Sequence, residues 1–148
     1  MDELSELRRL ADVQEIIGVT IAYCWALDGR QWHELDSVFV PDAEAILGHT
    51  RVSGREAIRE HCRKALDALD VSQHLVGSHQ VSLDSDRATC RCQLIAQHRR
   101  EAAPGGSSWL VGGTYEDQLR RTDAGWRITS RLLRITWTEG NREVLGPT

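Results

Sequence analysis

The chain lacks the features that identify most nucleotide-, metal- and nucleic-acid-binding proteins. It has no glycine-rich phosphate loop and no metal triad, so we expect neither a cofactor nor a metal. The formal net charge of -4 at pH 7 argues against a nucleic-acid surface, which usually needs a net basic face. No repeat, low-complexity stretch or linker interrupts the 148 residues, so we expect a single domain over residues 1–148.

Two further absences concern location and cysteine chemistry. The acidic segment Met1–Glu6 has no apolar core, and no apolar run approaches the length of a membrane span. The sequence therefore favours a cytoplasmic protein that does not bind membranes. A zinc site would need a second close cysteine pair or histidines at ligand spacing, so we interpret the cysteines as small buried apolar residues. They are Cys24, Cys62, Cys90 and Cys92.

The first half of the chain has helical periodicity. Apolar residues recur at three- and four-residue steps from Leu4 to Trp25, and Gly29 suits a helix end. Pro41 is expected to stop a second, short helix. We expect helices over residues 4–28, 32–39 and 55–69, with a short strand over 43–47.

After Asp70 the pattern changes to that of strands. Four runs are expected to be extended, over residues 74–83, 88–101, 109–120 and 126–137, and the turn residues at 122–125 predict a hairpin between the last two. Helices followed by a long antiparallel meander are typical of an α+β fold. The space between the helices and a curved sheet is a natural place for a largely apolar pocket.

Asp28 and His74 are the residues that suggest chemistry. Both lie in apolar surroundings, where a carboxylate is costly to bury without a partner. Imidazole changes its protonation near neutral pH, so the two side chains in contact would form a general-base dyad. The alternatives are a solvated carboxylate at a helix end, which the helix dipole disfavours, and a strand histidine bonded to backbone.

Several short motifs in this order resemble the SnoaL-like branch of the nuclear-transport-factor-2-like superfamily, which includes scytalone dehydratase, bile-acid 7α-dehydratase and hexachlorocyclohexane dehydrochlorinase. Each motif is weak alone, and together they span nearly the whole chain. They are Ala22-Tyr23, Ala26-Leu27-Asp28, Trp32, Phe39-Val40-Pro41-Asp42-Ala43, Gly54-Arg55-Glu56-Ala57-Ile58, Gln73-His74, Tyr115-Glu116-Asp117, and Gly125-Trp126-Arg127-Ile128 with Arg131.

The resemblance implies a cone-shaped α+β barrel, in which N-terminal helices pack on a curved mixed or antiparallel sheet and enclose a pocket. It also implies that Asp28 and His74 match the family's catalytic pair and that Tyr23 matches a catalytic tyrosine of the dehydratases. Arg131 matches a pocket arginine, and His98 loosely matches a second histidine of scytalone dehydratase. Both are therefore expected to bind substrate.

Alternative roles for these residues are also compatible with the sequence. Tyr23 precedes Asp28 by about 500° of helical rotation, so the two share a pocket only if the helix end bends or unwinds. It could instead be a core aromatic, His98 a partly exposed strand histidine, and Arg131 half of a structural ion pair. Trp25, one helical step from Asp28, is the tryptophan expected to touch a ligand. His79 stands where many relatives have asparagine.

Two classes of function follow. The first is a cofactor-independent enzyme in which His74 removes a proton, leading to elimination, isomerisation or ring closure of a small hydrophobic or polyketide-like substrate. The second is a non-catalytic ligand-binding or oligomer-building module, resembling the small subunit of a ring-hydroxylating dioxygenase.

The sequence also predicts a homo-oligomer. An outer sheet face rich in leucine would be more apolar than a monomer tolerates, and the resemblance favours a trimer over a dimer. The leucines expected on that face are Leu94, Leu110, Leu119, Leu132 and Leu133.

Overall fold

The elements of the computed structural model, which describes residues 2–146, are helical first and extended afterwards, as the periodicity predicts. In chain order they are α1 (Glu3–Asp28), the 3-10 helix η1 (Trp32–Ser37), β1 (Phe39–Leu47), β2 (Thr50–Ser53), α2 (Arg55–Leu66), β3 (Val71–Asp84), β4 (Arg87–Arg99), β5 (Ser108–Thr122), β6 (Gly125–Gly140) and the 3-10 helix η2 (Arg142–Leu145).

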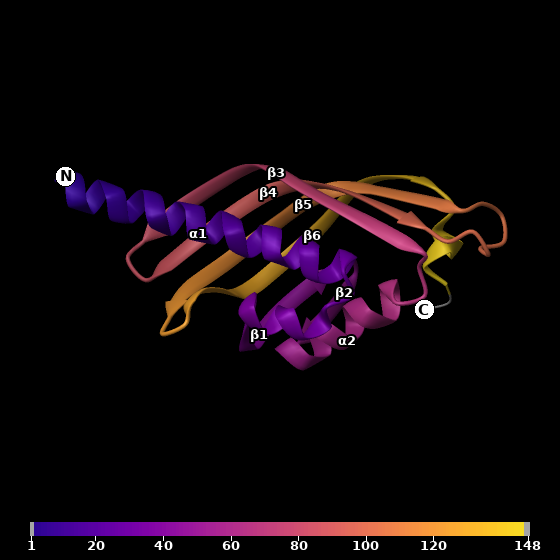
Figure 1. Cartoon of the computed structure of the whole chain (residues 1–148), viewed down its shortest axis with the longest axis horizontal. Coiled ribbons are helices and arrows are strands. Elements are labelled where there is room, and N and C mark those ends of the chain that lie inside the picture. Colours follow the sequence, from indigo (N-terminus) through magenta and orange to yellow (C-terminus); the bar gives the residue numbers. More distant parts are fainter. Residues whose placement is uncertain (1, 147–148) are drawn as a thin grey trace.

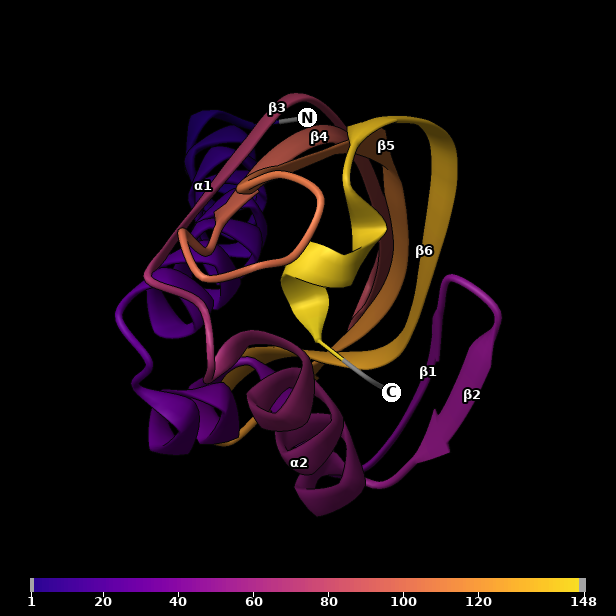
Figure 2. The same cartoon turned by 90° about the vertical axis from the view of Figure 1, so that its right-hand side faces the viewer.

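The strands form one six-stranded mixed sheet in the order β2-β1-β6-β5-β4-β3. Only the β1–β6 pairing is parallel, and the other four pairings are antiparallel. Figure 1 shows α1 lying across the sheet, and the end-on view of Figure 2 shows the sheet curving around α1, α2 and η2. The α+β prediction with a cone-shaped, curved sheet is confirmed, although the sheet remains open between β2 and β3 and does not close into a barrel.

Three local features differ from what the sequence predicts. Pro41 lies inside β1 instead of only stopping a helix, and the β1–β6 register shifts between Phe39 and Glu44. An irregularity of this kind accommodates proline, which cannot donate a ladder hydrogen bond. The strand β2 and the helix η2 were not anticipated, because elements of four residues carry almost no periodic signal.

The end of α1 uses Arg30, not Gly29, as its left-handed residue. Arg30 has φ 56°, whereas Gly29 is right-handed at φ -87°. The amide of Gln31 donates to the carbonyl of Ala26, and the amide of Arg30 donates to Leu27. These two bonds form a Schellman motif, in which glycine usually occupies the position that Arg30 holds here.

The inner face of the sheet is more apolar than expected and the outer face less so. Alternate side chains of β4 from Ala88 to His98 are buried, and Leu94 and Leu119 are 3% and 1% exposed. Leu133 lies on the same inner face, opposite the buried Tyr115. Placing these three leucines on the outer face was therefore wrong, because strand alternation turns them toward the helices. The large apolar side chains that the sheet does expose include Leu75, Ile95 and Trp137.

Helix α1 also corrects the expectation that no segment reaches membrane-spanning length. Its 26 residues contain an 18-residue window of mean hydropathy 1.3, which is long and apolar enough by length and composition to cross a membrane. Within that window 39% of the residues are buried inside the protein. A helix packed against its own sheet passes the same test, so the finding is weak evidence for a membrane span.

The sheet depends on a close approach between β5 and β6 at Gly113, where the register shifts. A Cβ at this position would overlap the backbone carbonyl oxygen of Arg134, which cannot rotate away. Gly113→Ala should therefore lower the free energy of unfolding by about 1–3 kcal/mol, as overpacking does. Urea denaturation measures this change. The control is Gly77→Ala in β3, whose Cβ would meet nothing within 4 Å. A loss in the control equal to that in Gly113→Ala would contradict the steric argument.

Candidate active site

The end of α1 and the start of β3 bring Asp28 and His74 into direct contact. His74 Nδ1 lies 2.7 Å from Asp28 Oδ1, and the His74 backbone amide donates to Asp28 Oδ2 at 2.8 Å. The Ser72 hydroxyl donates to Oδ1 at 2.9 Å. Because the two ends of the carboxylate are held by one strand, its plane and that of the imidazole are fixed relative to each other.

These contacts define the proton positions of the pair. Burial raises the pKa of Asp28, but the hydrogen bonds from His74 and Ser72 outweigh burial and lower the pKa below its ordinary value. The carboxylate is therefore ionised at neutral pH and can only accept hydrogen bonds. His74 must carry its proton on Nδ1, which leaves Nε2 as the free lone pair of the neutral ring.

His74 also lines an internal cavity of about 170 Å³ between the sheet, α2 and η2. In Figure 2 the short yellow helix η2 lies within the open end of the cone. The cavity wall is mainly apolar, with polar groups at a few points. Its residues are Tyr23, Leu27, His61, Cys62, Ala65, Leu66, His74, Leu94, Ala96, His98, Trp109, Val111, Tyr115, Leu133, Ile135, Arg142 and Leu145.

Tyr23 and Asp28 lie on opposite sides of the imidazole. Helix α1 continues unbroken to Asp28, so the angular offset of the two side chains is retained. Tyr23 lines the cavity, whereas Asp28 lines a groove of about 370 Å³ outside it. His74 lines both spaces and connects them. The helix end does not bend, and Tyr23 and Asp28 accordingly line different spaces, as the helical offset predicts.

Tyr23 is a neutral donor at the cavity wall. Burial raises its pKa well above the ordinary value, and its hydroxyl lies 3.6 Å from Cys62 Sγ. Sulfur is a weak hydrogen-bond partner. The hydroxyl is therefore available to a ligand. Its other close neighbours are aromatic: the rings of Phe39 and Tyr115 pack edge-on at centroid distances of 5.9 and 5.7 Å.

His98 lies beside His74, with the two ring centroids 5.8 Å apart, and it lines the same cavity. Its Nδ1 is 2.8 Å from the carbonyl oxygen of Trp109, which can only accept. Nδ1 therefore carries the proton and Nε2 is an acceptor. Burial lowers the pKa of His98 to about 4, so the ring is neutral at physiological pH.

Arg131 forms the structural ion pair that was the competing interpretation. Its Nε and one terminal nitrogen each lie 2.8 Å from a carboxylate oxygen of Asp117, and both side chains are fully buried. Its guanidinium carbon also lies 4.3 Å and 3.8 Å from the ring centroids of Tyr23 and Tyr115. Arg131 is not part of the cavity wall, so it acts behind the two tyrosines.

Trp25, which we expected to touch a ligand, lies outside the cavity, in the groove that Asp28 and His74 also line. It is 72% exposed and lines the outer groove with Ile21 and Leu75. One helical step from Asp28 places it on the solvent side of α1. His79 is also away from the cavity wall, since its Nε2 is 2.8 Å from the hydroxyl of Thr20 in α1.

Sequence reasoning missed most of the cavity wall, including His61 and Tyr115. We interpreted His61 as a surface residue, yet it lines the cavity, and burial lowers its pKa. Its spacing of three from Ile58 and four from Ala65 could have placed it beside the buried face of α2. Tyr115 lies in the motif Tyr115-Glu116-Asp117 but was not assigned to the site. It shares the inner face of β5 with Val111.

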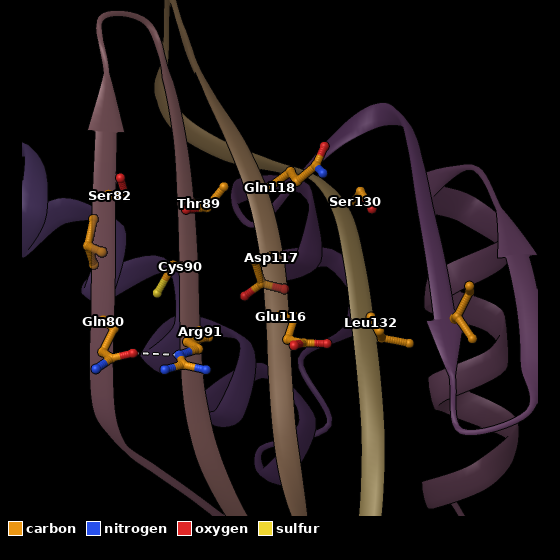
Figure 3. Close-up of a pocket in the computed structure, with 12 residues that line it drawn as sticks. Gln80, Ser82, Thr89, Cys90, Arg91, Glu116, Asp117, Gln118, Ser130 and Leu132 are labelled. Atoms are coloured by element: carbon orange, nitrogen blue, oxygen red, sulfur yellow. Dashed lines mark hydrogen bonds between the residues drawn. The ribbon is translucent and has the colours of Figure 1, made fainter.

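A second, wider groove lies away from the dyad. It has a volume of about 590 Å³ and runs over the outer face of the sheet. Figure 3 shows its side chains arising from β3, β4, β5 and β6, with Arg91 donating to Gln80. Its polar and charged lining contrasts with the cavity, so we place the candidate active site at His74. Over residues 2–146 no group of three or more His, Cys, Asp or Glu side chains could hold a metal ion.

His98 should make the protein less stable in mild acid. Its pKa is about 4 in the folded protein and near 6.5 when unfolded, so the unfolded chain binds the extra proton as pH falls between these values. Lowering the pH from about 7.5 to about 5 should therefore cost about 2 kcal/mol of unfolding free energy through this residue. Urea denaturation at both pH values checks this. His98→Gln should show a smaller acid loss than the wild type, and an equal loss would refute the assignment.

Comparison with known proteins identifies the family. Residues 8–132 match the model of the SnoaL-like domain. Terrestric acid biosynthesis cluster protein E of Penicillium crustosum is 29% identical over 116 residues, which cover 74% of each chain. The crystal structure of Kfla4162 from Kribbella flavida superposes with a TM-score of 0.85 at 24% identity, covering 93% of this chain and 98% of that one. A hexachlorocyclohexane dehydrochlorinase, LinA type 2, has the same fold, with a TM-score of 0.76 at 18% identity and 93% and 92% coverage. Because the family model spans most of its length, the chain belongs to the SnoaL-like domain family.

Proposed function

We propose that the protein is a cofactor-independent lyase, isomerase or cyclase that acts on a small hydrophobic or polyketide-like molecule. The observation that carries the proposal is the 2.7 Å contact between His74 Nδ1 and an ionised carboxylate, with the rest of the imidazole at an apolar cavity. This arrangement directs the basic lone pair of Nε2 away from Asp28. Family membership supports a role of the isomerase or cyclase type on a small molecule.

In the proposed reaction, His74 Nε2 takes a proton from a carbon next to a carbonyl or a leaving group. The Asp28 carboxylate stabilises the imidazolium that forms. The electron pair of the broken C–H bond either forms a double bond as the leaving group departs, or attacks a carbonyl carbon and closes a ring. The Tyr23 hydroxyl donates a hydrogen bond to the oxygen on which negative charge develops.

The cavity limits the size of the substrate. Its volume of about 170 Å³ is close to that of an engineered apolar cavity, about 150 Å³, which holds one benzene molecule. We therefore propose a substrate whose enclosed part is about one ring. The neutral Nε2 of His98 favours a hydroxyl group on that ring, because this nitrogen can only accept a hydrogen bond. The named role of the Penicillium crustosum relative in a biosynthesis cluster supports a small organic substrate.

The non-catalytic alternative is a binding or oligomer-building module with the same fold. Such a module has no need for an ionised carboxylate that fixes one imidazole tautomer at a cavity, and for that reason we favour the enzyme. We also propose a cytoplasmic location, because Cys24, Cys62, Cys90 and Cys92 are free thiols, as expected in a reducing compartment.

A homo-oligomer, with a trimer favoured, is part of the proposal. The outward side chains Leu75, Ile95 and Trp137 are 60%, 49% and 44% exposed, which supports association of the sheet faces. Light scattering at micromolar concentration should give a multiple of the 16.7 kDa chain mass. Ile95→Lys should shift the population toward monomer. A wild-type protein that is monomeric throughout would contradict the proposal.

The roles of the three residues can be ranked by activity. His74→Ala should lower kcat by roughly two to four powers of ten, and Tyr23→Phe by roughly two or three, because the base makes a bond to hydrogen and the tyrosine contributes one hydrogen bond. Asp28→Asn should lose nearly as much as His74→Ala, since an amide favours the wrong imidazole tautomer.

The substrate is sought by screening hydroxylated cyclic ketones and polyketide intermediates, with turnover followed by mass spectrometry. The control is His33→Ala, because His33 is exposed and is not part of the cavity wall. Wild-type turnover by Asp28→Asn would show that the dyad assignment is wrong.

A further inference from the structure

We infer that Arg30 and Ser72 are positioning residues that hold the Asp28 carboxylate in place and limit the basicity of His74. The two residues lie outside the cavity wall, and neither is reached by a ligand in it. They act through Asp28, so the inference rests on the proposed function of the Asp28–His74 dyad. A chain of hydrogen bonds behind Asp28 adjusts the strength of His74 as a base.

The direction of every hydrogen bond in this chain follows from the chemistry of its members. Arg30 Nη1 is 2.9 Å from Ser72 Oγ, and a guanidinium can only donate. The single hydroxyl hydrogen of Ser72 is then free for Asp28 Oδ1, which lies 2.9 Å away and can only accept. Asp28 Oδ1 also accepts from His74 Nδ1. Positive charge at Arg30 is thus connected to the imidazole through one hydroxyl and one carboxylate.

The backbone of Arg30 points to a role for its side chain. At φ 56° the backbone of a residue other than glycine is strained, and glycine is the usual residue at this position of a helix end. Arg30 Nη1 also donates to the carbonyl oxygen of Leu27 at 2.6 Å. The guanidinium therefore closes the last turn of α1 and reaches Ser72 with the same nitrogen. A glycine would fit the backbone better and would supply neither contact.

Asp28 at the end of α1 and Arg30 just beyond it are the formal charges in this hydrogen-bonded chain that bear on His74. The other titratable groups around the imidazole, at the cavity wall, are Tyr23 on α1, His61 and Cys62 on α2, His98 on β4, Tyr115 on β5 and Arg142 on η2. Burial raises the pKa of both tyrosines and raises that of Cys62 to about 11, and it lowers the pKa of both neighbouring histidines. These groups are neutral near pH 7, while Arg142 is a charged residue of the cavity wall that is exposed to solvent.

Asp28 and Arg30 act on the imidazole in opposite directions. The Asp28 carboxylate attracts positive charge on the ring and so favours the imidazolium over the neutral form. Arg30 opposes this effect, because a nearby cation disfavours a second positive charge. Ser72 acts in the same direction, since its hydrogen bond withdraws charge from the carboxylate oxygen that faces His74. With both in place, the attraction of Asp28 for positive charge on the imidazole is weakened.

The test is an NMR titration of His74 in the intact protein, which needs no substrate. The imidazole carbon-bound protons are followed from about pH 5 to about pH 9, and the resonance absent from His74→Gln identifies the residue. In Arg30→Gly and in Ser72→Ala the titration midpoint of His74 should rise by roughly half a pH unit or more. Arg30→Lys and Ser72→Thr, which retain the charge and the hydroxyl, should restore most of the wild-type midpoint.

Ser85→Gly is the matched backbone control, because Ser85 has φ 56° in the turn between β3 and β4. It relieves the same strain as Arg30→Gly and should leave the His74 midpoint unchanged. Unchanged midpoints in both Arg30→Gly and Ser72→Ala would overturn the inference, as would a shift in Ser85→Gly of equal size. Asp28→Asn separates the two proposals: it should lower the midpoint if the dyad exists, whatever Arg30 and Ser72 do.

Discussion

The site depends on how one carboxylate is stabilised at the end of α1. Negative charge at a helix C-terminus is opposed by the helix dipole, and half-burial adds a desolvation cost. Asp28 is accommodated because β3 supplies a backbone amide, a hydroxyl and an imidazole N–H, all within 2.9 Å. The same three bonds attach the helix end to the edge strand and select the tautomer of His74. The position of the helix end and the chemistry of the base therefore have one physical origin.

Around this pair the protein keeps other polar groups uncharged. Burial holds Tyr23, Tyr115 and His98 neutral, and Arg131 is matched by Asp117 behind the tyrosine rings. Among the residues of the cavity wall, His74 is the one whose ring contacts a carboxylate, and this carboxylate stabilises the charged imidazolium. Groups with different protonation in one small space are the usual arrangement for acid–base chemistry. The apolar wall strengthens it, because charge that develops in such a space interacts strongly with the few dipoles present.

Much of the fold could be predicted because it rests on short-range patterns. The three- and four-residue spacing of α1 and the alternation of β4 follow from which side chains must be buried. Asp28 and His74 were identified because ionisable residues in apolar segments need partners, and the resemblance of scattered motifs indicated which partner. The same reasoning failed for Leu94 and Leu119, since alternation shows that two faces differ but not which one meets the helices. It failed for His61 because a histidine beside charged residues has the same local pattern whether or not a cavity lies next to it.

By itself the sequence determined the order of the elements, the α+β class and the identity of the acid and the imidazole, because each depends on residues close together in the chain. Only the tertiary structure decided what these residues do to one another. It placed Tyr23 inside the cavity and Trp25 outside it, paired Arg131 with Asp117, and connected Arg30 to Asp28 through Ser72. The physical reason is that a hydrogen bond or ion pair depends on separations of a few ångströms. Those separations arise from the packing of α1 against β3. This packing brings together residues that are more than forty positions apart in the sequence.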